Sequence, residues 1–478
     1  MSVNIKLGNK TITGVEAVQL KNASSDGTYI KFEQSTSVEN GYTVQFMVEG
    51  RLYSSVSVMA GSVVSRPTSP TAASKYFIGW YDAETAGAEI TFPYTPTSNV
   101  TFYAHFTSSI IVGVTGLTNS SGDLTLTDSI SNVDTYTTVR NENFTSVVNP
   151  LSEYFPFNQI EEFTDSEGNV FVKFPKIWMK WEKDSSGNIS GYKFSNGKAD
   201  DDYFISDAYL NPSDTTGNTY CDYFALGKYE MSGSSSKGFS KSGVPCLTNI
   251  TIADAREASR AYGNASNLAN GYQQLDLAQL VMYNLLCMMF YRTANIQKVY
   301  GGRTGCGTVP MWENASVTGT CDGVAGMNGW NTSTDCVKML GIENPYGNVF
   351  KWVDGVWFSD ATIYVHRFSQ QYTDGTWNAK TLQFNRPTSD GYVKYLKSGD
   401  TSDTRSFVYA SETTGDSNSE PTYYGDYAWY TSTVTGTVLC AGGAWDFTTA
   451  AGLWSLTGSH TNSVTYPLIG ARLSYRPL

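Results

Sequence analysis

Two stretches of this 478-residue chain space their apolar residues with the period of a helix. Helical patterns are thus rare in the chain, and this rarity constrains the fold more than any other feature. The stretches are residues 252–262 and 275–295, and Asp276 stands where an N-cap would begin the second. The apolar side chains that share one face of the second stretch are Leu277, Leu280, Val281, Leu285, Met288 and Met289. Elsewhere, bulky and polar residues alternate in short runs, as in half-buried strands. We therefore predict a multidomain chain, all-β in its N-terminal part and α+β, with two helices, in its C-terminal part.

The chain is too long for one ordinary hydrophobic core, because domains usually contain about 100 to 200 residues. Residues 1–36 hold two alternating stretches, separated by Asn-Ala-Ser-Ser-Asp-Gly, which predict a strand pair. We expect this part to be either an attachment segment or an ordered β extension. Residues 108–150 are rich in Ser, Thr, Asn and Asp, which predicts a connector with some strand character. Residues 151–478 then form the C-terminal domain, with strand-like runs in FVKFPKIWMKWEK and DYFALGKYEMS.

Short strands with Gly and Pro between them predict a compact all-β unit over residues 37–107. The order YTVQFMVEG, RPTSPT, YFIGWYD and NVTFYAHF resembles an internalin-type B repeat, a β-grasp-like spacer of surface proteins. The resemblance implies that Gly79, Trp80 and Tyr81 build the core, and Phe106 stands where the family usually has Trp. We therefore interpret Trp80 as a core residue and not as a ligand platform.

Charge and composition limit the partners of the chain. Its formal net charge is −12, and it has no long basic run, which argues against the phosphate neutralisation that nucleic-acid binding needs. Charged residues make up 16% of the chain and aromatic residues 14%, with 32 Tyr among them. This composition is typical of amphipathic contact surfaces.

The N-terminal sequence contains no basic region followed by an apolar one, and no stretch approaches the roughly 18 uninterrupted apolar residues of a membrane span. We therefore expect neither Sec export nor membrane insertion. A surface-acting protein without an export signal fits a virion component that is made in the host cytoplasm and released by lysis.

The residues that usually carry catalysis or bind metals do not form recognisable patterns. Seven cysteines contain no Cys-x-x-Cys pair, three histidines complete no metal-ligand spacing, and no loop has the carboxylate density that calcium requires. We predict no metal and no cofactor, and we expect mostly free, buried thiols. One acidic run consists of Asp200, Asp201 and Asp202. We interpret it as a solvated turn and not as the source of the two carboxylates that cleave a glycan. No Gly-x-Ser-x-Gly elbow accompanies the histidines, His105, His366 and His460.

The segment GIENPYGNVFKWVDGVWF, residues 341–358, lies in a Gly-rich and Trp-rich region for which we expect long irregular loops. It resembles the GNVWEW element of the C-type-lectin-fold domains shared by formylglycine-generating enzymes and the target proteins of phage diversity-generating retroelements. Phe350 and Lys351 replace the usual Trp and Glu. The retained residues, which we interpret as a tight turn leading into a core strand, are Gly347, Asn348, Trp352 and Asp354.

Residues 440–478 resemble the variable region of those retroelement targets, which opens with Gly-Gly-x-Trp and closes with Gly-Ala-Arg. In such proteins fixed residues hold the backbone, and substituted side chains form an exposed binding face. The resemblance implies a fixed scaffold of Gly442, Gly443, Trp445, Trp454, Gly470 and Arg472. It implies diversified, ligand-binding positions at Ala444, Asp446, Phe447, Ala450, Ser459, His460, Val464, Tyr466 and Leu468.

The codon chemistry of that family gives a simple test. Adenine-specific mutagenesis of AAY codons yields residues encoded by NNY, which excludes Lys, Glu, Gln, Met and Trp. Between Ala444 and Ile469 the excluded residues that occur are Trp445 and Trp454, which we assign as fixed. All nine candidate positions are compatible with the rule. Phe, Tyr and His side chains on a rigid scaffold supply contact area at a small entropic cost; equally, Phe447, Tyr466 and Leu468 could complete the core.

Two alternatives remain. A formylglycine-generating oxidase uses a cysteine pair after its Gly-Gly element to bind copper, but Phe447 and Gly452 stand at those places, and Cys440 lies on the other side of the glycines. We therefore expect no enzyme. A bacterial surface adhesin with the same domain would carry a signal peptide or an anchor, and neither is visible in the sequence.

The resemblances together imply a phage tail-fibre protein whose C-terminal C-type-lectin-fold domain binds a host-cell surface receptor, either a protein or a glycan. They also imply a homotrimer at the fibre tip, which other phage tail proteins hold through the N-terminal segment.

Overall fold

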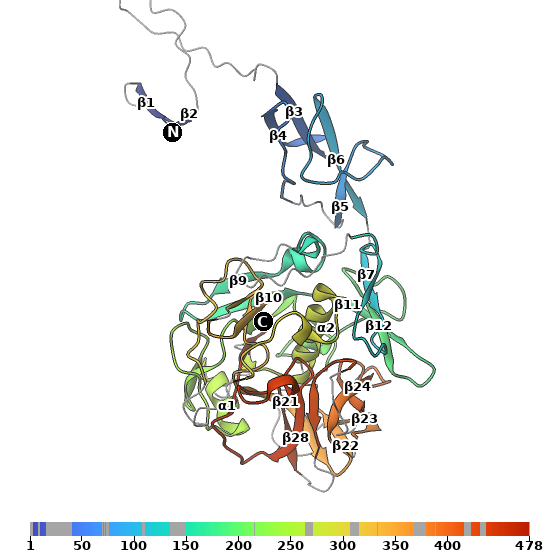
Figure 1. The fold of residues 1–478 in the computed structure, drawn as a ribbon, viewed down its shortest axis with the longest axis vertical. Helices are drawn as coiled ribbons and strands as arrows, with labels where there is room; N and C mark the ends of the chain where they lie inside the picture. The colour runs from blue at the N-terminus through green and yellow to red at the C-terminus, as the bar shows by residue number, and fades with distance from the viewer. Residues whose placement is uncertain are drawn as a thin grey trace, which may run out of the picture. The chain divides into compact units, whose positions relative to one another are not determined.

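The computed structural model describes residues 3–7, 10–15, 41–107 and 110–477, apart from 69, 71, 73–75, 134–148, 215, 263–270, 306–314, 332, 368–378, 388, 415–421 and 431–435. The chain divides into two compact units, Met1–Ser108 and Ser109–Leu478. Most of the described elements are strands, and two are α-helices (Figure 1). The prediction of a multidomain chain, rich in strands and with two helices, is confirmed.

The N-terminal segment contains an antiparallel pair, β1 (Val3–Leu7) with β2 (Lys10–Val15). Both strands lie in the first of the two alternating stretches that the sequence showed. The second stretch, TYIKFEQ, lies outside the described residues.

The first unit also holds a four-stranded sheet in the order β4-β3-β6-β5. Its strands are β3 (Gly41–Val48), β4 (Arg51–Met59), β5 (Tyr76–Tyr81) and β6 (Val100–Thr107). Alternate residues of β3 and β6 face one side and form a small core, in which the Trp80 ring packs edge-to-face on Phe46 at 4.8 Å. Trp80 is only 1% exposed, so its assignment to the core is confirmed.

Two five-stranded sheets form one part of the second unit, in the orders β17-β30-β14-β10-β9 and β13-β11-β12-β7-β8. The strands of the first are β9 (Glu161–Thr164), β10 (Val170–Pro175), β14 (Tyr223–Gly227), β17 (Tyr272–Gln274) and β30 (Leu473–Tyr475). Those of the second are β7 (Ile111–Thr115), β8 (Thr125–Asp128), β11 (Trp178–Lys183), β12 (Ile189–Ser195) and β13 (Phe204–Ile205). The run FVKFPKIWMKWEK is thus two strands in different sheets, because Pro175 ends β10.

A nine-stranded sheet forms the other part, in the order β23-β22-β21-β27-β28-β26-β24-β25, with β29 also paired to β21. Its strands are β21 (Phe350–Ser359), β22 (Thr362–Val365), β23 (Lys380–Asn385), β24 (Gly391–Ser398), β25 (Val408–Thr413), β26 (Tyr427–Trp429), β27 (Thr437–Ala441), β28 (Leu456–Thr461) and β29 (Ile469–Gly470). The expectation of long irregular loops here is corrected. Strands such as β21 are buried on both faces and therefore lack the alternating pattern.

The remaining elements are short. β15 (Ser232–Ser234) pairs with β16 (Lys237–Phe239), and β18 (Gly329–Asn331), β19 (Cys336–Met339) and β20 (Ile342–Glu343) form a three-stranded sheet. Short 3-10 turns occur at η1 (Pro150–Glu153), η2 (Phe157–Gln159), η3 (Asp207–Tyr209), η5 (Ile296–Lys298) and η7 (Thr448–Ala450).

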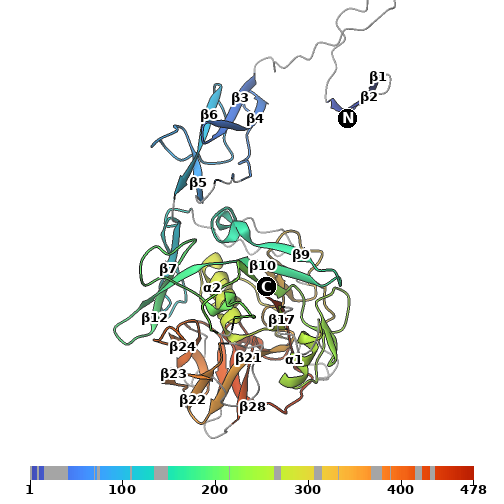
Figure 2. The same ribbon diagram turned by 180° about the vertical axis from the view of Figure 1, so that it is seen from behind.

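Both helices begin at capping boxes. α1 (Ile252–Arg260) starts after Thr251, and α2 (Leu277–Tyr291) starts after Asp276, as the sequence predicted. All fifteen residues of α2 are buried, not one face alone, and Figures 1 and 2 show α2 lying among the strands of the second unit. No helix in the described ranges is long and apolar enough to cross a membrane.

The predicted connector, residues 108–150, needs a correction for its first part. β7 pairs with β12 from Thr115↔Gly191 to Ile111↔Ser195, and β8 continues the same sheet. Residues 111–128 are therefore part of the second unit. The apolar strand residues Val112 and Val114 are fully buried, which explains why this segment folds into the unit and does not link two others.

Candidate ligand-binding site

The opening glycines of the C-terminal segment follow β27 directly. Gly442 and Gly443 have φ values of +99° and +74°, a backbone region that favours glycine. A Cβ on Gly443 would lie 2.5 Å from the Cβ of Ala451, so no side chain fits there. These two residues turn the chain away from β27, and the structure agrees with a scaffold role for both.

Two buried tryptophans hold the segment. The Trp445 amide donates to the Asn348 carbonyl at 3.1 Å. The Trp454 amide donates to Asp426 Oδ2 at 2.7 Å, and its indole contacts the Met288 sulfur of α2 at 3.3 Å. Both rings are about 1% exposed, so they anchor the backbone and do not face a ligand.

The closing residues are equally fixed. The buried Arg472 guanidinium donates to four backbone carbonyls, those of Gly227, Lys228, Glu343 and Asn344. A Cβ on Gly470 would lie 2.7 Å from a backbone oxygen, that of Leu247. The six predicted scaffold residues are thus all buried.

The Gly-Asn-Val turn leads into β21, as predicted. Gly347 and Asn348 both have positive φ, and the Asn348 amide group donates to Glu230. Lys351, at the position of the usual Glu, forms a buried ion pair with Glu230 at 2.9 Å, and burial lowers the pKa of Lys351. Trp352 donates from its indole to the Ile250 carbonyl at 2.9 Å. The turn is therefore a structural element built around an internal ion pair.

The nine candidate ligand-binding positions differ in accessibility. Ala444 is fully buried in the core, so its assignment to the ligand-binding set is corrected. Phe447, Val464 and Leu468 are half-buried and pack against the same core. Tyr466 is 47% exposed and is a large apolar side chain open to solvent. The other four, all half-buried, are Asp446, Ala450, Ser459 and His460.

Eight residues remain, and we call them the C-terminal candidate site: Asp446, Phe447, Ala450, Ser459, His460, Val464, Tyr466 and Leu468. They come from two segments that meet at Phe350. The Phe447 ring packs on the Phe350 ring at 4.8 Å, and the Phe350 amide donates to the Leu468 carbonyl at 2.8 Å. Within the second segment the rings of His460 and Tyr466 lie 5.5 Å apart.

Further aromatic residues adjoin the site, and the sequence interpretation missed them. Trp429 packs edge-to-face on Phe447 at 5.0 Å, and Tyr427 contacts Trp429 at 4.7 Å. Tyr392 then contacts Tyr427 at 5.2 Å, and its hydroxyl lies 3.2 Å from that of Thr449. β26 carries Tyr427 and Trp429 beside β28 by parallel pairing. No local pattern in the sequence reveals such pairing.

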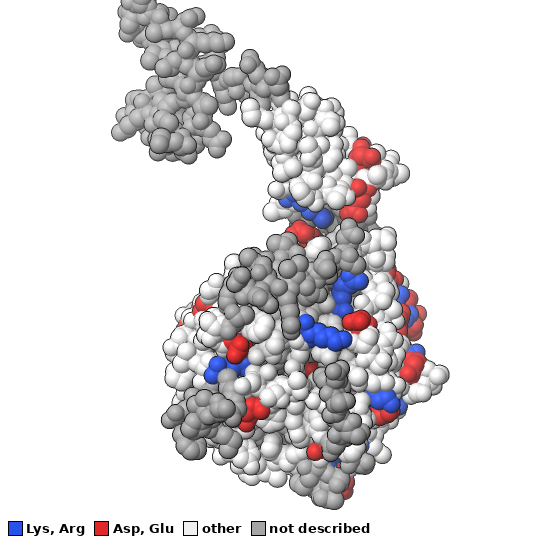
Figure 3. All heavy atoms as spheres, in the orientation of Figure 1, with Lys and Arg blue, Asp and Glu red and all other residues white. Residues whose placement is uncertain are grey.

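The site carries little charge. Burial raises the pKa of Asp446, whose Oδ1 is buried and accepts no hydrogen bond from the described residues. Burial lowers the pKa of His460, which favours its neutral form. The face of the second unit in Figure 3 is mostly uncharged, with acidic and basic groups scattered over it. The side chains of the site therefore suit contacts made by aromatic rings and hydrogen bonds.

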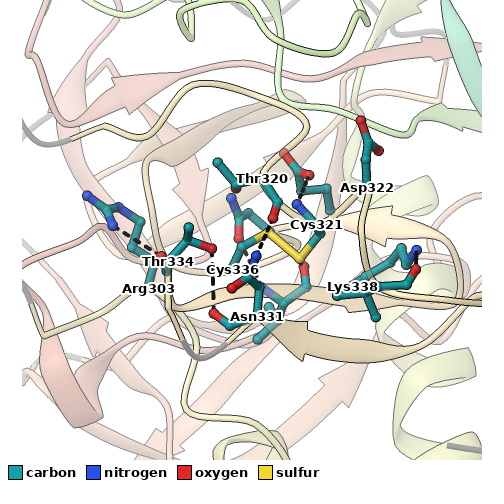
Figure 4. Close-up of a disulfide and its surroundings, with 12 residues drawn as sticks. Arg303, Thr320, Cys321, Asp322, Asn331, Thr334, Cys336 and Lys338 are labelled. Atoms are coloured by element: carbon teal, nitrogen blue, oxygen red, sulfur yellow. Dashed lines mark hydrogen bonds between the residues drawn. A yellow bond between two sulfur atoms is a disulfide. The ribbon is translucent and has the colours of Figure 1, made fainter. Parts of the chain in front are cut away.

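The cysteine positions differ in part from the expectation. Four of the described cysteines are free: Cys221, Cys246, Cys287 and Cys440. Cys321 and Cys336 form a disulfide, which the sequence analysis did not predict (Figure 4). At the places of the oxidase thiols, Phe447 packs among rings and Gly452 lies against Asp426. The nearby Cys440 is buried in β27, and burial raises its pKa.

The acidic run lies at the surface. Asp200 and Asp202 form ion pairs with Lys180 at 3.1 and 2.7 Å, and Asp201 pairs with Lys198 at 2.7 Å. These side chains of the run are half to fully exposed, which agrees with a solvated turn.

Solved structures that are similar to this chain include the following three. PvdO from Pseudomonas aeruginosa has a TM-score of 0.29 and 11% identity, over 66% of this chain and 98% of its own. Variable protein 1 of Treponema denticola has a TM-score of 0.26 and 10% identity, over 66% and 99%. The M1 variant of the Major Tropism Determinant has a TM-score of 0.27 and 12% identity, over 79% and 76%.

Comparison of sequences gives a relative and a matching family model. Internalin H of Listeria monocytogenes serovar 1/2a is 33% identical over 105 residues, which are 21% of this chain and 18% of Internalin H. The chain therefore matches less than a fifth of that relative's length. The family model that matches is the Listeria-Bacteroides repeat domain, over residues 42–105. These residues, which form the four-stranded sheet of the first unit, are thus an internalin-like repeat.

Proposed function

We propose that this chain is a receptor-binding protein, which attaches to a molecule on a host-cell surface through the C-terminal candidate site. The observation that carries the proposal is the contrast within residues 440–475. The glycines, tryptophans and arginine of the scaffold are buried, whereas Tyr466 is 47% exposed beside His460. A rigid backbone that presents an accessible aromatic side chain loses little entropy on binding.

The wider setting follows from the sequence resemblances. The protein is proposed to sit at a phage tail-fibre tip, as a trimer held to other tail proteins by its N-terminal segment. Its C-terminal domain would have the C-type-lectin fold, and a retroelement would diversify the candidate site. Trimerisation would raise a weak single-site affinity through avidity.

The proposed role is binding and not catalysis. Phe447 and Gly452 occupy the places where an oxidase would carry its thiol pair. Phe447 is enclosed by the rings of Phe350 and Trp429, and Gly452 leaves no room for a side chain, because its Cβ would fall 1.7 Å from Asp426 Oδ1. A cysteine at 452 would therefore not fit this backbone.

The test is binding of the full chain to intact candidate host cells. We expect Tyr466→Ala to weaken binding roughly tenfold or more, as truncation of a central aromatic contact does. The triple variant Asp446→Ala, Phe447→Ala and Tyr466→Ala should abolish it. The matched control is Tyr53→Ala, a tyrosine of the first unit that is 42% exposed. Equal binding by the native chain and both Tyr466 variants, once all are shown to fold, would place the receptor site elsewhere.

A further inference from the structure

The disulfide lies beside a buried carboxylate. Cys321 is in the turn before β18, Cys336 begins β19, and Glu343 ends β20. The two sulfur atoms and a carboxylate oxygen of Glu343 all lie within 4.8 Å of one another, and all three residues are buried. Figure 4 shows the two cysteines facing each other, with Thr320 next to Cys321. Sulfur and oxygen donors thus converge on one point inside the unit.

Two backbone hydrogen bonds hold the Glu343 carboxylate in place. Its Oε1 accepts from the Gly319 amide at 2.8 Å and its Oε2 from the Cys321 amide at 2.9 Å. These bonds leave a lone pair on each oxygen. Within the described part of the chain, Glu343 forms no ion pair. The carboxylate can therefore act as a ligand without giving up either backbone hydrogen bond.

Three cationic side chains in this part of the unit bind other groups. Lys338 donates to the Val324 carbonyl, and Lys228 pairs with Glu162 at 3.1 Å. Arg472 donates to the backbone oxygen of Glu343, not to its carboxylate. A disulfide needs no carboxylate beside it, so the disulfide alone does not account for Glu343.

We propose that Cys321, Cys336 and Glu343 form a metal site when the disulfide is reduced. Two thiolates and one carboxylate suit a divalent ion of borderline softness, and Zn²⁺ fits this donor set best. Three protein ligands leave one tetrahedral position for a fourth. The Thr320 hydroxyl is a candidate, since its oxygen is buried and has no hydrogen-bond partner among the described residues.

The disulfide and the metal exclude each other. Reduction by a phosphine breaks the S–S bond and yields two thiols, while the phosphine takes up the oxygen of a water molecule and the two hydrogens of that water go to the sulfurs. Zn²⁺ then displaces the two thiol protons as it binds. In a reducing compartment the metal would hold residues 321–343 together, and in an oxidising one the disulfide would do so.

The experiment uses the full chain, purified with a phosphine reductant and without chelator. Elemental analysis should find about one Zn²⁺ per reduced chain, as expected for a single site. Substitution by Co²⁺ should give the sulfur-to-cobalt absorption of a thiolate site and the visible bands of a tetrahedral ion. Oxidation with a disulfide-forming reagent should release the metal and remove two titratable thiols.

Two variants separate this site from other thiols. Glu343→Gln keeps both sulfurs and the shape of the side chain, and it should weaken zinc binding by at least the roughly tenfold that outer-shell changes cause. Cys246→Ser, which alters a free cysteine outside the site, should leave zinc binding unchanged. The proposal fails if the reduced native chain binds no zinc, or if Glu343→Gln binds zinc as tightly as the native chain. The cobalt spectrum of the native chain decides the matter even where a variant does not fold.

Discussion

Tyr466 and Phe447 are both candidate contact residues, but they hold opposite positions in the second unit. The half-buried Phe447 ring packs on the rings of Phe350 and Trp429, whereas Tyr466 is 47% exposed. We expect Phe447→Ala to lower the free energy of unfolding by about 2 kcal/mol, about half the cost at a fully buried site. Tyr466→Ala should change it by less than about 0.5 kcal/mol. Denaturant titration of both variants measures the difference.

The unfolding free energies of these two variants decide whether a loss of binding by Tyr466→Ala reports a lost contact or an unfolded protein. If Tyr466→Ala destabilised the unit as much as Phe447→Ala, Tyr466 would be a packing residue, and a loss of binding by that variant would report unfolding.

His460 should make stability depend on pH. Burial lowers its pKa in the folded protein, while the unfolded chain keeps a pKa of about 6.5. Below that pH the unfolded chain gains a proton that the folded protein resists, so stability is lost as the pH falls. Relative to the native chain, His460→Gln should lose less stability between pH 7.5 and pH 5.5, as thermal melts would measure. A parallel loss in both proteins would contradict this assignment, and other groups would then account for it.

The role of a single residue could be predicted from the sequence where its chemistry allows one role. Trp445 and Trp454 were assigned to the scaffold because their codons fall outside the diversified set, and both are buried. The codon rule does not assign Ala444 to the scaffold. Its methyl group is compatible with either a core or a surface, and the turn at Gly443 directs it inward. The Cys321–Cys336 pair escaped prediction because spacing in sequence does not reveal which strands bring sulfurs together.

Among the elements, the two capping boxes offer a matched comparison. Thr251 caps α1 through Asp254 alone, whereas Asp276 caps α2 and also forms a buried ion pair with Arg476 at 2.7 Å. We expect Thr251→Ala to cost about 1 kcal/mol. Asp276→Ala should cost about 3 to 5 kcal/mol, because it leaves a buried guanidinium without its partner. Chemical denaturation of the two variants measures both costs, and equal values would show that the ion pair adds nothing.

The helices were predicted because their signals are local. A cap and a 3.6-residue period mark α2 within a single window of the sequence. β7 and β8 carry no such mark. β7 pairs with β8 on one side and with β12 on the other, and β12 begins at Ile189, far along the chain. The polar residues around β7 and β8 are typical of a connector. The candidate site is non-local in the same way, since β26 brings Trp429 to Phe447.

At the scale of the whole molecule, the two compact units have separate cores, and we expect them to unfold independently. Trp80→Ala removes the largest side chain of the first core and should cost that unit about 3 to 5 kcal/mol. Calorimetry should then show one transition lowered and the other unchanged. Trp454→Ala should do the reverse. A single transition that moves in both variants would mean that the units stabilise each other.

The position of β30 has a consequence for how the protein is made. Residues 473–475 lie between β14 and β17, in a sheet whose other strands are synthesised long before them. While the ribosome is still translating, that sheet has a gap, and the facing edges of β14 and β17 lack their partner. A nascent chain can close its sheet only after residue 475 has emerged from the exit tunnel. Prematurely terminated chains therefore remain open and prone to aggregate, so a chain must carry the whole of residues 440–475 to reach its folded state.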